Sequence, residues 1–105
     1  MMIWNISYSD SFWQDIKEIA SYISEILQEP QIAEKQVERI FDAADSLEHM
    51  PERHRVYDSI VERKPEVRFF PVDNYIIFYQ PVEILKTVKI LRVIYGGRDI
   101  GSLNI

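Results

Sequence analysis

Hydrophobic residues in the first half of the chain recur at the spacing of two α-helices. Steps of four and three residues place side chains along one helical face. The first such stripe consists of Phe12, Ile16, Ile19, Ile23 and Ile26, and the second of Ala33, Val37, Ile40, Ala44 and Leu47. Pro30 disfavours helix in the residue before it but suits a first helical position. The short break between the stripes therefore predicts an antiparallel helix hairpin, with the second helix from about Pro30 to His49.

Polar residues and prolines mark the ends of these helices. Ser11 is followed three residues later by Gln14, a pair that fits a capping box at the start of the first helix. Pro51 ends the second helix. Residues 51–65 are polar and lack a clean period, which indicates a connecting segment with a short turn or strand around residues 56–61.

Shorter apolar runs, rich in β-branched and aromatic residues, predict four strands. They span residues 2–8, 66–72, 75–82 and 87–95. Ile3 and Ile6 of the first run are expected to point toward the core. Short reversals join the last three runs, which predicts an antiparallel meander. The order β-αα-βββ describes a single α+β domain over residues 1–105, with a long helical hairpin packed on one face of a small antiparallel sheet.

Two arginines interrupt the apolar pattern of the strands. In the last strand, strict alternation places Val88, Ile90, Arg92 and Ile94 on one face. Arg68 lies between Val67 and Phe69 in an earlier strand. A buried guanidinium without a partner is very costly, so both arginines need solvent or a carboxylate. One interpretation is ion pairing with Glu66, Asp73 or Asp99 on an uncovered face; the other is a basic, aromatic-edged face that binds phosphate or an acidic partner segment.

Composition removes several classes of function. The chain has no cysteine, which excludes disulfides, iron–sulfur clusters and thiolate zinc sites. His49 and His54 are isolated histidines, so we expect no metal site, and we expect no cofactor. The net charge is −5, divided into −8 over residues 1–52 and +3 over residues 53–105, which disfavours a globally basic RNA-binding protein. There is no apolar run of about 20 residues and no signal-peptide pattern, so we expect a cytoplasmic protein without a membrane partner.

Two segments carry a resemblance to a known family. The stretch RFFPVDNYIIFYQP (68–81) and the ending ILRVIYGGRDI (90–100), together with the order β-αα-βββ, resemble the RelE/ParE superfamily of toxins from type II toxin–antitoxin pairs. The resemblance covers nearly the whole chain and implies a toxin that a cognate antitoxin neutralises. It also implies one of two targets: RelE-like members cut mRNA on the ribosome, and ParE-like members poison DNA gyrase.

The residues favour the ParE-like branch. RelE-like members place an arginine directly after the tyrosine that opens the middle strand, and Ile76 stands at that position here. If the chain were an mRNA interferase, Arg68, Arg98 and Tyr95 would carry its chemistry, but this set is incomplete for a nuclease. The long helices and the acidic net charge also favour a ParE-like protein.

The resemblance leaves several partners open. We expect a plasmid-stabilisation type toxin that arrests growth by inhibiting gyrase, with a RelE-like ribosome-dependent endoribonuclease or a non-toxic binding member of the family as alternatives. The expected partners are an antitoxin and gyrase, or the ribosome and mRNA in the RelE-like case, within a homodimer or a toxin–antitoxin hetero-oligomer. The candidates for binding target or antitoxin are Arg68, Arg92, Arg98, Asp99 and Trp13.

Overall fold

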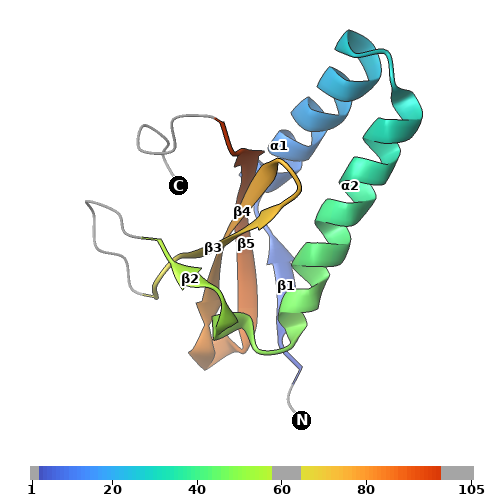
Figure 1. The fold of residues 1–105 in the computed structure, drawn as a ribbon. Helices are drawn as coiled ribbons and strands as arrows, with labels where there is room; N and C mark the ends of the chain where they lie inside the picture. Colours follow the sequence, from blue (N-terminus) through green and yellow to red (C-terminus); the bar gives the residue numbers. More distant parts are fainter. Residues whose placement is uncertain (1–2, 58–64, 98–105) are drawn as a thin grey trace.

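Two antiparallel helices cover one face of a five-stranded sheet (Figure 1). The computed structural model describes residues 3–57 and 65–97. The elements are β1 (Asn5–Tyr8), α1 (Asp10–Ser21), η1 (Tyr22–Ile26), α2 (Pro30–Asp45), η2 (Ser46–Glu48), η3 (Pro51–Arg53), β2 (Arg55–Val56), β3 (Arg68–Val72), β4 (Tyr75–Val82), η4 (Glu83–Leu85) and β5 (Thr87–Tyr95). The predicted α+β class and element order are confirmed.

The strands lie in the order β1-β5-β4-β3-β2. The meander β3-β4-β5 is antiparallel, as the short reversals predict. However, β1 pairs in parallel with β5, with Asn5 opposite Thr87 and Tyr8 opposite Ile90. The sheet is therefore mixed rather than purely antiparallel, because the first strand of the chain lies beside the last one. The connecting segment contributes only the short edge strand β2 within the described residues.

The first helix begins earlier than the predicted capping box. Ser9, at the end of β1, is the N-cap: its Oγ accepts a hydrogen bond from the Phe12 amide at 3.0 Å. Ser11 lies within the first helical turn instead. The same Ser9 hydroxyl donates to the Leu91 carbonyl at 2.7 Å. One extended residue thus caps α1 and ties it to β5, which Ser11 is too far along the chain to do.

The hairpin turns through a π-helical segment. The Leu27 amide donates to the Tyr22 carbonyl at 3.1 Å, five residues back, so each turn of η1 holds more residues than an α-helical turn. This shift takes Ile26 out of the predicted stripe, and its side chain is exposed. Figure 1 shows the tip of the hairpin well away from the sheet. The second helix ends at Asp45 and continues as the short helix η2, which ends before His49.

The main core lies between the hairpin and the sheet. Its fully buried members come from both helices and from β4 and β5, and include Phe12, Ile40, Leu47, Ile77, Tyr79 and Ile90. Ile6 packs against this core, as predicted, but Ile3 is exposed because β1 starts only at Asn5. A smaller cluster on the other face contains Val67, Phe78 and Ile94.

A β-bulge in β5 changes which face its side chains occupy. Phe78 pairs with Arg92 but the next residue, Tyr79, pairs with Ile90, so Leu91 is the extra residue. Val88, Ile90 and Val93 belong to the main core, whereas Ile94 belongs to the cluster on the opposite face. The prediction that Val88, Ile90, Arg92 and Ile94 share one face is therefore wrong beyond Ile90. Alternation with period 2 fails wherever an extra residue is inserted.

Candidate functional site: a groove beside the helical hairpin

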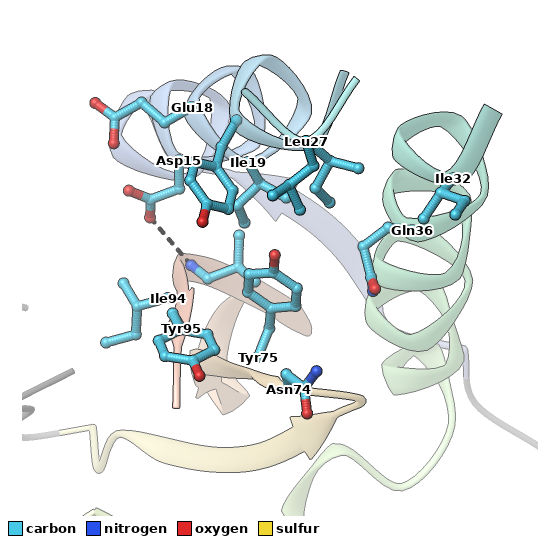
Figure 2. Close-up of a pocket in the computed structure, with 13 residues that line it drawn as sticks. Asp15, Glu18, Ile19, Leu27, Ile32, Gln36, Asn74, Tyr75, Ile94 and Tyr95 are labelled. Carbon is cyan, nitrogen blue, oxygen red and sulfur yellow. Dashed lines mark hydrogen bonds between the residues drawn. The ribbon is translucent and has the colours of Figure 1, made fainter. Parts of the chain in front are cut away.

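A groove of about 620 Å³ lies between the hairpin and the end of the sheet where β4 begins and β5 ends (Figure 2). One wall comes from the hairpin and carries Ile19, Tyr22, Leu27 and Ile32. The other wall comes from the sheet and carries Tyr75 and Tyr95. Tyr22, Leu27, Ile32 and Tyr95 are each between 51% and 58% exposed. Large apolar side chains gathered in one exposed depression mark an interaction site.

Glycine shapes the sheet wall. A Cβ atom at Gly97 would lie 2.5 Å from Cε2 of Tyr95, so the ring occupies the space that only glycine leaves open. The Gly96 amide donates to the Asn74 carbonyl at 2.8 Å and holds the end of β5 against the β3–β4 turn. Neither glycine has a positive φ. Glycine therefore suits these two positions because neighbouring groups lie close to the backbone, and not because the backbone adopts an unusual conformation.

Asp15 joins the helix wall to the sheet wall. Its carboxylate accepts hydrogen bonds from the Arg92 guanidinium at 2.7 and 2.9 Å and from the Val93 amide at 3.1 Å. Asp15 is only 6% exposed. The hydrogen bond from Arg92 to Asp15 raises the pKa of the guanidinium. Arg92 thus forms an ion pair with Asp15 of α1, a carboxylate outside the predicted set of Glu66, Asp73 and Asp99, of which Asp99 lies outside the described residues.

Arg68 lies at the opposite end of the sheet, where its guanidinium donates hydrogen bonds to backbone carbonyls. Its Nη1 donates to the Glu52 carbonyl at 3.1 Å and to the His54 carbonyl at 2.8 Å. These bonds attach η3 and the start of β2 to β3. Among the described residues Arg68 is therefore held by carbonyl oxygens and not by the predicted carboxylates, because the polar connector folds over it.

The structure places Arg68 and Tyr95, two of the candidate nuclease residues, far apart. Arg68 pairs with Tyr79 and Tyr95 pairs with Tyr75, so four residues of β4, about 13 Å, separate their positions along the sheet. Ile76 packs with the cluster on the other face. Arg98 and Asp99 lie outside the described residues.

Trp13 lies in an aromatic cluster away from the groove. Its ring is 5.4 Å from that of Phe41 and 5.8 Å from that of Tyr8, measured between centroids. It is 46% exposed, so one part of the ring packs and the other remains available for contact. The phenol of Tyr8 donates to Asp45, and burial together with this carboxylate raises its pKa.

Several groove residues are absent from the sequence-based candidates. Asp15 lies beside the first apolar stripe, and Tyr22, Leu27 and Ile32 flank Pro30 at the hairpin turn. The sequence signal that could identify them is a set of large apolar residues around a turn, where polar residues are the norm.

Burial raises the pKa of Tyr75, and the nearby phenols of Tyr22 and Tyr95 raise it further.

The described residues contain no cluster of three or more His, Asp or Glu side chains placed to hold a metal ion. Within residues 3–57 and 65–97, no helix combines the length and apolarity needed to cross a membrane.

The fold is similar to that of several solved toxin structures. The chromosomal ParDE toxin–antitoxin system from P. aeruginosa matches with a TM-score of 0.72 and 19% identity, over 89% of this chain and 96% of that one. The archaeal RelE–RelB complex from Pyrococcus horikoshii OT3 matches with a TM-score of 0.62 and 17% identity, over 92% and 99%. The RelBE2 complex from Mycobacterium tuberculosis matches with a TM-score of 0.57 and 20% identity, over 90% and 93%. The fold is therefore that of the RelE/ParE superfamily.

The family model described as the ParE toxin of the type II toxin–antitoxin system, parDE, matches residues 6–100. Because the match spans nearly all of the chain, the chain belongs to the ParE toxin family. A search of curated proteins found no significant match.

Proposed function

We propose that this chain is a ParE-like toxin that inhibits DNA gyrase in the cytoplasm and is neutralised by a cognate antitoxin. The observation that carries the proposal is the match of the ParE family model to residues 6–100. In this proposal the toxin is of the plasmid-stabilisation type and arrests growth when the antitoxin does not neutralise it.

The arrangement of the described residues supports gyrase over mRNA as the target. A ribonuclease of the RelE kind needs cations and a proton donor or acceptor around one phosphate. Arg68 holds two backbone carbonyls, Tyr95 lies at the other end of the sheet, and an aliphatic residue occupies position 76. An inhibitor that acts by binding needs a surface rather than a convergent catalytic set, and the groove offers one.

The antitoxin partnership rests on the same family match and on the groove. The similar structures from Pyrococcus horikoshii and Mycobacterium tuberculosis are complexes of a toxin with its antitoxin. Half-exposed Tyr22, Leu27 and Ile32 form an apolar surface of the kind that a protein partner covers. Of the predicted contact residues, Trp13 is exposed for a partner, whereas Arg68 and Arg92 are engaged within the fold.

A supercoiling assay with gyrase from the native host tests the target. We expect purified toxin to inhibit supercoiling in a dose-dependent way, and pre-incubation with the antitoxin to restore it. Unchanged supercoiling over a wide range of toxin concentrations would overturn the gyrase proposal.

Primer extension on mRNA after induction of the toxin tests the ribosomal alternative. We expect growth arrest without new cleavage sites in mRNA. Cleavage at codons in the ribosomal A site would assign the chain to the RelE-like activity, and normal growth during induction without the antitoxin would indicate a non-toxic binding member.

A further inference from the structure

Two tyrosines on the sheet wall of the groove, Tyr75 and Tyr95, lie across from α1, which carries carboxylates. The rings of Tyr75 and Tyr95 lie 6.2 Å apart between centroids and are inclined at 72°, so they contact each other edge to face. Tyr22 lines the same groove from the hairpin. We call Tyr22, Tyr75 and Tyr95 the tyrosine cluster. Figure 2 shows Tyr75 and Tyr95 standing on the sheet below α1, which carries Asp15 and Glu18.

The charges around this cluster are unbalanced. The groove is lined by two carboxylates, Asp15 and Glu18, and by no lysine or arginine among the described residues. Asp15 is neutralised by Arg92. Glu18 is exposed, and its carboxylate accepts one bond at 3.3 Å from the neutral amide of Gln14. One negative charge is therefore left over at the rim of an aromatic depression.

Ring faces and a carboxylate attract the same kind of group. The face of a tyrosine ring carries partial negative charge and attracts a lysine ammonium or an arginine guanidinium. A nearby carboxylate adds a direct Coulombic attraction. Tyr22, Tyr75 and Tyr95 line the same groove, which places the cluster around one space. A cation fits this space better than an apolar or an anionic group.

We propose that the groove binds an amphipathic segment of the antitoxin, with one lysine or arginine of that segment packed against the half-exposed ring of Tyr95 beside Glu18. Apolar side chains of the segment pack on Ile19, Leu27 and Ile32. This inference rests on the proposed function, because it takes the antitoxin as the partner. It adds the chemistry of recognition: a single cation held by an aromatic ring within an apolar contact.

The test measures binding of the full chain to the antitoxin encoded beside it by isothermal titration calorimetry. Removal of the Tyr95 ring in Tyr95→Leu is expected to weaken binding by roughly 3- to 30-fold. Tyr95→Phe keeps the ring face and is expected to bind within about twofold of the original chain. Glu18→Gln is expected to weaken binding at low salt and much less at high salt. Glu25→Gln, on the same hairpin but outside the groove lining, is the matched control.

A second arm identifies the cation. Each lysine and arginine of the antitoxin is replaced in turn by methionine, and each change is combined with Tyr95→Leu in a double-mutant cycle. We expect one position whose effect disappears when the Tyr95 ring is absent. Equal affinity of Tyr95→Leu and the original chain would overturn the inference, and so would additivity at every basic position.

Failure of the proposed function gives a different result. If the original chain does not bind the antitoxin at all, the partnership itself is overturned and the groove assignment falls with it. If the chain binds the antitoxin but Tyr95→Leu binds equally well, only the tyrosine cluster loses its role. Thermal unfolding of each variant confirms that Tyr95, which is 58% exposed, can be changed without loss of the fold.

Discussion

The carboxylate of Asp15 lies 2.7 Å from Nε of Arg92, although 77 residues separate the two in the chain. The pair closes the edge of β5 at the point where its strand partner β1 has ended. Asp15 also accepts the Val93 amide, which would otherwise lie on an unpaired sheet edge. One buried carboxylate thus replaces a strand neighbour and fixes α1 against the groove wall.

Asp15→Ala is expected to lower the free energy of unfolding by about 3 kcal/mol. The reason is that Arg92 loses its two hydrogen bonds to Asp15 and the Val93 amide loses its acceptor, while both remain largely buried. Urea denaturation followed by circular dichroism measures the change. Glu18→Ala, three residues along the same helix and exposed, is the control and is expected to cost less than about 0.5 kcal/mol. A small effect for Asp15→Ala would mean that water replaces the carboxylate at little cost.

Stability should fall as the pH drops below about 6.5, the ordinary pKa of histidine. Burial lowers the pKa of His54, and the nearby Arg53 lowers it further. His54 stacks on Phe70 at 4.2 Å between ring centroids, with its Nε2 buried and without a hydrogen-bond partner in the described structure. The unfolded chain therefore takes up a proton at a higher pH than the folded chain.

It follows that the contribution of His54 is fully present above the ordinary pKa and is lost as the pH falls through it toward the lowered pKa of the folded state. Unfolding free energies between pH 5 and pH 8 measure this slope. His54→Gln is expected to flatten it. An equal slope in His54→Gln would refute the assignment.

Ile76→Arg restores the arginine that RelE-like members carry, but it is not expected to create mRNA cleavage. Ile76 lies in the cluster on the other face of the sheet from Tyr95, and Arg68 is bound to carbonyl oxygens. A charge at this half-buried position should instead destabilise the fold by about 1–3 kcal/mol. Primer extension with purified ribosomes, together with thermal unfolding, checks both parts. New cleavage sites in mRNA would show that the catalytic set is nearly complete.

Gly97→Ala is expected to displace the ring of Tyr95 with little loss of stability. The new Cβ would lie 2.5 Å from Cε2 of an exposed ring that can rotate away. The loss of nuclear Overhauser contacts between the Tyr75 and Tyr95 rings would report the movement. Gly96→Ala is the comparison, because its Cβ would meet the fixed Asn74 carbonyl at 3.3 Å and act on the backbone instead. Unchanged contacts in Gly97→Ala would show that the backbone yields before the ring does.

The helices and the meander follow from local patterns, and the sequence predicts them well. The stripes through Phe12 and Ile40 are buried because a 3.6-residue period brings them to one face. The parallel pairing of β1 with β5 is different, since no local signal states which strand lies beside which. The same holds for Asp15 and Arg92, whose contact exists only after the sheet and hairpin have packed.

The residues that line the groove could not be predicted from local patterns either. Leu27 widens the apolar stripe of the first helix and therefore favours a core position, but the π-helical segment turns it outward. Tyr95 is a candidate only as part of the nuclease set that the resemblance implies, and the structure puts it on the groove wall. Its neighbour Tyr75 comes from another strand, so their meeting depends on the register of β4 against β5.

The extra residue, Leu91, determines which face of the sheet each later side chain of β5 occupies. Before Leu91 the even-numbered residues of β5 face the main core, and after it the odd-numbered residues do. Ile90 and Val93 therefore share a face although they are three positions apart. A deletion of this single residue would make Ile90 and Arg92 chain neighbours, restore regular alternation and leave every remaining side chain on its present face. A strand that kept Leu91 but paired it regularly would instead place Arg92 and Ile94 on the face of Ile90, so that the binding half would present them where Val93 and Tyr95 now lie.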